Sequence, residues 1–269
     1  MEIKFVNTSC KKNNITILHN LNFVIEDNKI TGIVGHNKTA LIEMIYGKMP
    51  PLNGEIYIGD YLIEDLDISE IKRDLALVSQ NTKEGFYTDR VIDEMYFIIN
   101  ATEFVCDDIN DRINKSLEMC GLDSSYLKRK ISDLSSGEKK LLQFSCSLLC
   151  NPKVLILDEP FANLDSNNKK KIINLIRLLR DRYHKTIIIS SNDTNMLYEV
   201  TDNIIILAND TAIVNGPSSE ILAIPELLNK YEIDMPDIIK FTYLAKKKGI
   251  KLHYHNDIRD LIKDVYKHV

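Results

Sequence analysis

The segment VLILDEP, residues 154–160, decides the fold. Four apolar residues followed by two acids are typical of a strand that is buried on both faces and ends in paired carboxylates. In an open α/β sheet, ligands bind beyond the carboxyl ends of the strands. Asp158 is therefore a candidate magnesium ligand, and Glu159 a candidate to orient or deprotonate an attacking water. An acid-rich helix N-terminus would explain the two acids equally well, so the surrounding sequence has to decide.

Apolar runs and helical patterns alternate around this segment, which predicts an α/β domain with a largely parallel sheet. From about residue 88 to 150 the patterns are helical, and no strong strand signal occurs. Turns are expected at 26–29 and at Asn53-Gly54. The expected strands cover 2–7, 16–25, 30–35, 55–61, 75–80, 153–158, 186–191 and 203–208, and the expected helices include 38–46 and 166–183.

The chain has 269 residues, enough for one or two domains with a well-buried core. Its character changes after Gly216-Pro217, where short helical segments interrupted by prolines begin. We therefore expect a first domain over residues 1–217, with a helical subdomain at about 85–150. A small C-terminal helical domain is expected over 218–269.

Composition excludes several classes of protein. A net charge of −5 argues against nucleic-acid binding. No stretch approaches 18 uninterrupted apolar residues, so we expect no direct membrane insertion. Five scattered cysteines, an odd number, fit reduced thiols in a cytosolic protein better than disulfides or a zinc site.

Three further segments suggest phosphate chemistry. LSSGEKK at 134–140 places small residues before an apolar helix, where hydroxyl and backbone N–H groups can meet a phosphate. Taken alone, a plain helix cap explains that segment better. ANLD at 162–165 follows the paired acids, and Gln80 stands at the end of an expected strand.

This ordered set resembles the ABC ATPase family over roughly residues 1–217. Gln80 matches the Q-loop glutamine, LSSGE at 134–138 the signature, LILDEP at 155–160 the Walker B strand, and ANLD the D-loop. The resemblance implies a P-loop NTPase core with an antiparallel β edge, and ATP and Mg²⁺ as ligands. It implies catalytic roles for Glu159, Gln80 and Asn192, nucleotide contacts from Gly35, Lys38, Thr39, Ser135, Gly137 and Asp165, and metal contacts from Asp158, Gln80 and Thr39.

A narrower resemblance is to the energy-coupling-factor (ECF) ATPases of vitamin and metal-ion importers. It rests on Gly35-His36 and on the tail, with Leu227-Leu228, Met235-Pro236, the helix around 244–249 and the segment 257–269. It implies a subunit at the cytoplasmic face of the cell membrane, held there by an integral membrane coupling subunit. A separate membrane protein selects the substrate in such systems, so this sequence is not expected to encode it.

The phosphate-binding loop departs from the family pattern G-x-x-x-x-G-K-[ST]. Only His36 and Asn37 separate Gly35 from Lys38, so three residues are missing, and Asn37 stands where the second glycine belongs. A loop this short cannot wrap a phosphate. Lys38 and Thr39 at the start of a helix would attract an anion only weakly.

Two other nucleotide contacts are missing as well. Asn192 stands where the family has a histidine that contacts the γ-phosphate, and an amide carries no charge. The family also places an adenine-stacking aromatic near residue 12, where this chain has Lys12.

ABC ATPases work as head-to-tail dimers, in which the signature of one subunit contacts the nucleotide of the other. We therefore expect a heterodimer in which this chain is the weak half. Its partners would be a second ABC ATPase subunit and the membrane subunit, with motion passing through the segment after Gln80. Three alternatives stay open: an ATPase with an unusual loop geometry, a scaffold whose signature is idle, and a soluble ABC protein without a membrane partner.

Overall fold

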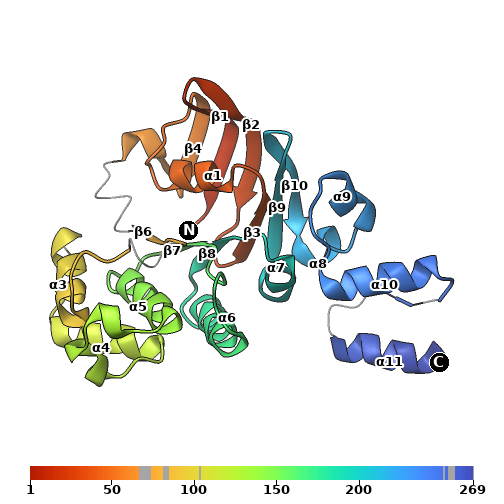
Figure 1. Cartoon of the computed structure of the whole chain (residues 1–269). Helices are drawn as coiled ribbons and strands as arrows, with labels where there is room; N and C mark the ends of the chain where they lie inside the picture. The colour runs from red at the N-terminus through yellow and green to blue at the C-terminus, as the bar shows by residue number, and fades with distance from the viewer. Residues whose placement is uncertain (67–73, 81–84, 103, 251, 254–257, 269) are drawn as a thin grey trace.

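The computed structural model describes residues 1–66, 74–80, 85–102, 104–250, 252–253 and 258–268. The segment directly after Gln80 and the start of the tail segment 257–269 lie outside these ranges. Within the described ranges the chain forms two sheets with helices around them (Figure 1).

A six-stranded sheet forms the centre, in the order β10-β9-β3-β8-β7-β6. All neighbours pair in parallel except β9 and β10, which confirms the predicted α/β class. Sequence patterns did not predict β10. It follows Asn209 and Asp210, whose φ angles of 50° and 58° form a tight hairpin turn. The strands are β3 Ile30–Gly35, β6 Leu75–Val78, β7 Val154–Asp158, β8 Thr186–Ser190, β9 Asn203–Ala208 and β10 Thr211–Pro217.

The predicted antiparallel edge is a separate sheet with the order β2-β1-β4-β5. Its first strand runs well beyond residue 7, because a hairpin turn at Asn13-Asn14 lets β1 pair with β2 along its whole length. The turn predicted at Asn53-Gly54 is wrong, because both residues lie in β4. The strands are β1 Ile3–Lys12, β2 Ile15–Ile25, β4 Asn53–Ile58 and β5 Tyr61–Leu62.

Helix α1 lies against the antiparallel sheet, and the other helices gather in three places (Figure 1). The group α3, α4 and α5 lies beside the β6 edge, α6 and α7 lie under the sheet, and α8 to α11 lie beyond the β10 edge. None of the described helices has both the length and the apolar character needed to cross a bilayer. The helices are α1 Lys38–Ile45, α3 Val91–Ala101, α4 Ile109–Met119, α5 Ser136–Leu148, α6 Ser166–Asp181, α7 Thr194–Val200, α8 Ser218–Ile221, α9 Pro225–Lys230, α10 Asp237–Lys247 and α11 Ile258–His268, with 3-10 turns at Ile63–Asp65, Ser124–Lys128 and Ile131–Asp133.

Side chains of the central strands point alternately to the two faces of the sheet and pack into two apolar cores. In β7, Ile156 packs on the side of α1 and the antiparallel sheet, while Leu155 and Leu157 pack on the side of α3 to α7. Burial on both faces explains why this strand is a continuous apolar run in the sequence. The site described below therefore sits on a rigid support.

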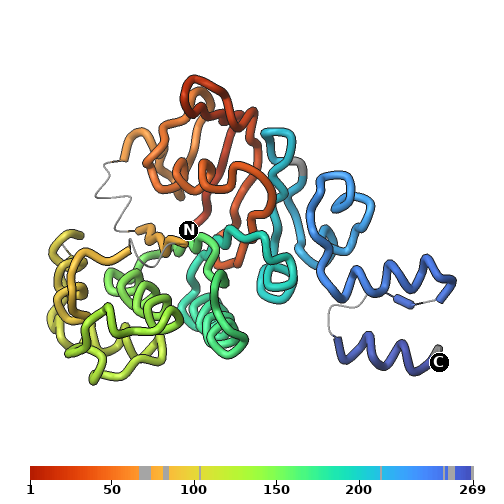
Figure 2. The backbone as a smooth tube through the Cα atoms, viewed as in Figure 1, coloured from red at the N-terminus to blue at the C-terminus, as the bar shows by residue number. Residues whose placement is uncertain are grey.

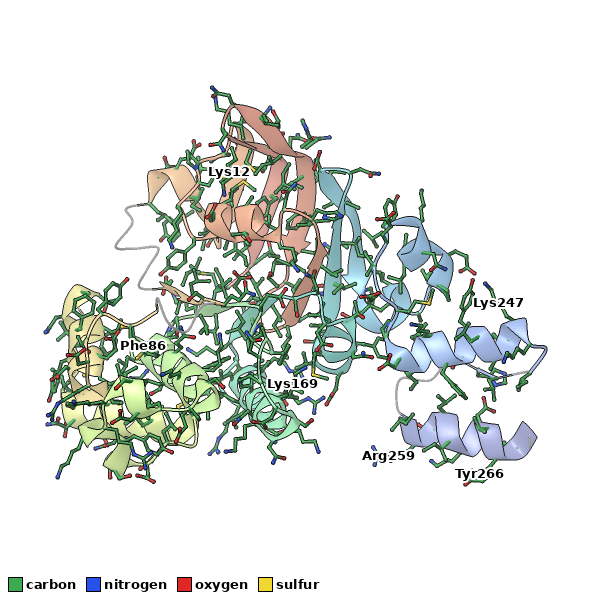
Figure 3. All side chains as sticks on the ribbon, in the orientation of Figure 1. Lys12, Phe86, Lys169, Lys247, Arg259 and Tyr266 are labelled. Atoms are coloured by element: carbon green, nitrogen blue, oxygen red, sulfur yellow. The ribbon has the colours of Figure 1, made fainter. Side chains whose placement is uncertain are left out.

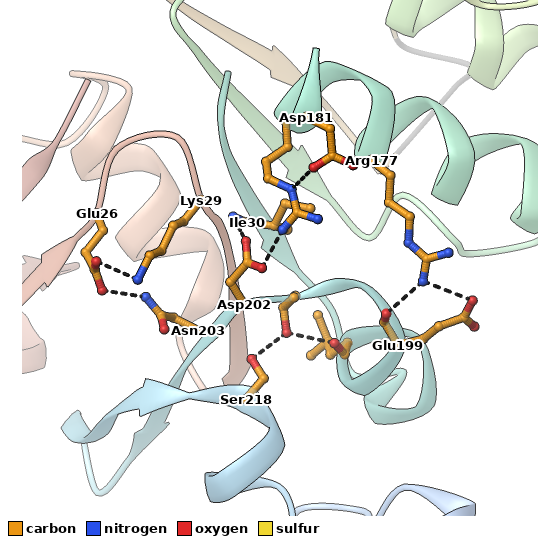
Figure 4. A network of polar contacts seen from close by, with 12 residues as sticks. Glu26, Lys29, Ile30, Arg177, Asp181, Glu199, Asp202, Asn203 and Ser218 are labelled. Carbon is orange, nitrogen blue, oxygen red and sulfur yellow. Dashed lines mark hydrogen bonds and ion pairs between the residues drawn. The ribbon is translucent and has the colours of Figure 1, made fainter. Parts of the chain in front are cut away.

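A polar network fixes the start of the C-terminal region to the core (Figure 4). Asp202 accepts a hydrogen bond from Ile30 N at 2.8 Å and forms an ion pair with Arg180. Its carbonyl accepts from the backbone N–H of Ser218, at the first residue of α8, and the hydroxyls of Ser218 and Thr201 lie 2.6 Å apart. These contacts tie the first residue of α8 to the core, and the domain boundary at 217 stays a prediction.

The last two helices lie one below the other and run in the same direction, away from the core (Figure 2). A small cluster of Ala245, Leu252 and Leu261 joins them. Lys247 on α10 and Tyr266 on α11 mark the end of the molecule that lies farthest from the helices α3 to α5 (Figure 3).

Candidate functional site

The shortened loop between β3 and α1 is closed by hydrogen bonds within the chain. Gly35 has φ 108°, and a Cβ there would lie 1.9 Å from the Leu207 carbonyl oxygen, so only glycine fits. The same carbonyl accepts from the His36 N–H at 3.0 Å. The backbone of the loop is therefore held against β9.

Asn37 completes the closure. Its φ of 57° is left-handed, and its side-chain amide donates to the Ile17 carbonyl at 2.8 Å and to Asp210 Oδ1 at 3.1 Å. The amide thus binds protein acceptors, and the Asp210 carboxylate adds negative charge beside the loop. Negative charge at this place opposes the approach of a phosphate.

Lys38, the first residue of α1, is buried with 9% of its surface exposed. Its Nζ donates to Glu159 Oε1 at 3.1 Å and makes a short hydrogen bond to Asn192 Oδ1. Three predicted site residues from three separate segments therefore meet, and they bind one another.

Both carboxylate oxygens of Glu159 are occupied. Oε1 also accepts from the Asn192 N–H at 3.1 Å, and Oε2 accepts from the Ser191 hydroxyl at 2.8 Å. This contact follows from the parallel pairing of β7 with β8, which brings their carboxyl ends together. Glu159 thus accepts three hydrogen bonds, and all three donors belong to this chain.

Asp158 is the predicted metal ligand at the end of β7. Its Oδ1 accepts from the Ser190 hydroxyl at 3.0 Å, and burial raises the pKa of its carboxyl, an effect that this hydrogen bond opposes. Gln80 follows the neighbouring strand β6 and is exposed, as is Thr39 in the first turn of α1. Among the described residues, no three His, Cys, Asp or Glu side chains cluster to hold a metal ion. The predicted magnesium set stays a prediction.

The signature segment lies at the start of α5, away from the closed loop. Ser135 is exposed and caps the helix, with its hydroxyl accepting from Glu138 N at 3.3 Å. Gly137 is buried against α6, where an added Cβ would lie 2.4 Å from Asn168 Nδ2. Asn168 in turn donates to Asp165 Oδ2 at 2.7 Å. Signature and D-loop therefore touch within the chain, through an asparagine that sequence reasoning missed.

Glu138, which replaces the glutamine of the family signature, binds Tyr126 and the start of α5. Its Oε1 accepts from the Tyr126 hydroxyl at 2.7 Å, and its Oε2 from the Ser135 N–H at 2.8 Å. These two hydrogen bonds, the first being the stronger cause, lower the pKa of Glu138 to about 2. Arg129 stacks on the Tyr126 ring with its guanidinium carbon 4.0 Å from the centroid, which places a cation beside the carboxylate.

Glu138→Gln, which restores the family residue, should lower the free energy of unfolding by about 1 kcal/mol at pH 7, because it removes a charged helix cap. The pKa of Glu138 is lowered on folding, so its contribution is present above pH 4.5 and is lost as the pH falls to about 2. Urea denaturation of both proteins at pH 7 and pH 3 tests this. The matched control is Glu118→Gln, on the exposed side of α4. A difference that stays constant with pH would refute the assigned cause.

A second residue missed by sequence reasoning is Lys140 on α5. Only 1% of its surface is exposed, and its Nζ donates to the carbonyls of Ser79 at 2.9 Å and Gln80 at 3.3 Å. The sequence does indicate that Lys140 is buried. Residues 137, 141, 144 and 148 form the buried face of the helix, and position 140 falls on that face.

The sequence is similar to that of known transport proteins. Residues 18–162 match the family described as ABC transporter. The chain is 30% identical over 244 residues to the energy-coupling factor transporter ATP-binding protein EcfA1 of Methanospirillum hungatei, covering 90% of this chain and 88% of the relative. It is 28% identical over 240 residues to the energy-coupling factor transporter ATP-binding protein EcfA2 of Caldanaerobacter subterraneus, covering 87% and 84%.

The fold is similar to that of CbiO1 from Clostridium perfringens, part of the ABC transporter complex cbiONQ. The TM-score is 0.76 with 24% identity, covering 90% of this chain and 98% of the other. This likeness supports the P-loop NTPase fold that the sequence predicted. Taken with the family match and with the ordered motifs at the carboxyl edge of the sheet, it leads to one conclusion: the chain belongs to the ABC transporter family.

Proposed function

We propose that this chain is the ATP-binding subunit of an ECF-like ABC importer and that it acts as the weak half of a heterodimer. In this arrangement the chain contributes its signature to the nucleotide held by the second ATPase. One observation carries the proposal: Lys38, Glu159 and Asn192 bind one another, while Ser135 stays exposed at the start of α5.

The residues of the chain's own site do not fit a bound triphosphate. A nucleotide would have to separate Lys38 from Glu159, break the bonds of Asn37 to Ile17 and Asp210, and approach Asp210 closely. Separating a mostly buried ion pair leaves an uncompensated charge, which is strongly unfavourable. ATP and Mg²⁺ are the ligands of the family as a whole, and we propose weak or absent binding of both at this site.

We place the contact with the membrane subunit at a groove beside Gln80. It has a volume of about 410 Å³ and runs between β6 and the helices α3 and α5. Glu94 of α3, with 0% of its surface exposed, lines it. Glu94 Oε2 accepts from the N–H groups of Tyr87 and Thr88, both at 2.9 Å, whereas Oε1 has no hydrogen-bond partner among the described residues.

The importer class rests on the relatives, which are named as energy-coupling factor transporter ATP-binding proteins. We propose a position at the cytoplasmic face of the membrane through the coupling subunit. Co-purification from the native source, with every partner identified by mass spectrometry, tests this placement. Recovery of the chain with neither a membrane protein nor a second ATPase would favour a soluble ABC protein.

The purified chain alone is expected to show no saturable Mg–ATP binding below about 1 mM, a binding free energy weaker than about −4 kcal/mol. The cause is the closed site around Lys38. Equilibrium binding of a fluorescent ATP analogue measures this, and the hydrolysis rate of the isolated chain should equal the buffer blank. Micromolar affinity together with normal turnover by the homodimer would show instead an ATPase with an unusual loop geometry.

A further inference from the structure

Lys140 is a buried cation that bridges two parts of the fold. Its backbone belongs to α5, four residues after the helix begins at Ser136 within the signature. Its Nζ donates to the carbonyls of Ser79 and Gln80, the two residues that follow β6. One side chain therefore links the signature helix to the residue that precedes the proposed path to the membrane partner.

The position is costly for a lysine. Burial lowers the pKa of its ammonium to about 8, and the nearby Asp158 only partly opposes this. Desolvating a charge is unfavourable unless fixed dipoles or counter-charges replace the water. Here two backbone carbonyls do so, and both belong to a single short segment. The side chain is thus held in one direction and resists separation of α5 from the end of β6.

We propose that Lys140 is a positioning residue that couples the segment around Gln80 to the signature. A displacement at Gln80 would draw the Lys140 ammonium with it, and the rigid, capped start of α5 would carry Ser135 and Gly137 along. This inference rests on the proposed function, because it assumes that the signature acts on a nucleotide held by a second subunit.

The chain contains a matched control in Lys185. It is also buried, with 8% of its surface exposed, and burial lowers its pKa as well. Its Nζ donates to Asn151 Oδ1 at 2.7 Å and to the Asn151 carbonyl at 3.3 Å, at the amino end of the sheet. Lys185→Met therefore removes a buried ammonium from two oxygens, as Lys140→Met does, without touching either motif.

The first experiment measures steady-state ATP hydrolysis by the complete complex with its second ATPase and membrane subunit. Lys140→Met is expected to lower kcat at least about tenfold with KM for ATP changed less than about twofold, because positioning in the transition state is lost. Lys185→Met should leave both constants near wild type. Lys140→Arg, whose guanidinium can donate to both carbonyls, should recover most of the lost kcat. Equal losses in the two methionine variants, or no recovery with arginine, would overturn the proposal.

The second experiment uses the isolated full-length chain and does not depend on turnover. Amide hydrogen exchange in the peptides covering 75–80 and 135–139 should accelerate together in Lys140→Met and in neither peptide in Lys185→Met. Unchanged exchange in Lys140→Met would overturn the link even if the complex loses activity. Accelerated exchange in both segments, with Ser135→Arg leaving turnover of the complex intact, would support the link and refute the trans role of the signature.

Discussion

Ser135→Arg in this chain should reduce ATP hydrolysis by the complete complex at least about 100-fold, a barrier increase of about 3 kcal/mol. The exposed hydroxyl of Ser135 lies at the N-terminus of α5, where we propose that it meets the partner's nucleotide. A long side chain there blocks that approach sterically, and the helix loses its cap as well. The measurement is steady-state phosphate release by the purified complex.

The control is Ser132→Arg, which adds the same charge at an exposed serine in the preceding 3-10 turn and should be nearly neutral. Glu159→Gln in this chain should cost no more than about threefold, because its carboxylate is already bound to Lys38 and Ser191. Turnover and transport unaffected by Ser135→Arg would establish the scaffold alternative, with an idle signature. A loss from Glu159→Gln as large as that from Ser135→Arg would mean that this chain hydrolyses ATP itself.

Much of the fold was predictable because buried parallel strands have a distinctive pattern. The cores of β7, β8 and β9 are continuous apolar runs, and all three lie within one residue of their expected positions. The prediction failed where pairing rather than composition decides the structure. β10 exists because the Asn209-Asp210 turn folds it onto β9. Gly54 lies inside β4, which pairs with β1, and the backbone of Asn7 lies too close to it for any other residue.

The candidate site also had parts that the sequence could predict and parts that it could not. The family resemblance placed Lys38, Asp158, Glu159 and Asn192 in one nucleotide site, and the structure brings them close to the ends of adjacent strands. The bonds among Lys38, Glu159 and Asn192 could not be predicted, because they depend on side-chain directions set by the register of β7 and β8. Asp210 and Asn168 carry no motif, so only their positions in space reveal their contacts with Asn37 and Gly137.

The shortened loop and the closed site are therefore two aspects of one arrangement. With only two residues between Gly35 and Lys38, the lysine enters the fold directly beside Glu159, and Asn192 supplies an acceptor that a protonated histidine would not. Glu159 neutralises the charge of Lys38, as a phosphate would in a nucleotide site of the family. The shortened loop and Asn192 are thus compatible with each other. We expect that correcting only one of them would not restore nucleotide binding.

Restoring both should create a nucleotide site. Insertion of Gly-Ser-Gly between Asn37 and Lys38, combined with Asn192→His, rebuilds the full pattern G-x-x-x-x-G-K-[ST] and should raise the affinity for Mg–ATP at least about 100-fold, or about 3 kcal/mol. The inserted backbone supplies N–H groups to a phosphate and moves Lys38 away from Glu159. Equilibrium binding of a fluorescent ATP analogue measures the gain, and circular dichroism checks the fold. Adding Lys38→Ala to the repaired chain should remove most of the gain, because the lysine is the cation that pairs with the phosphates. A folded, repaired chain that binds ATP no better than the natural one would show that the short loop is not what limits binding.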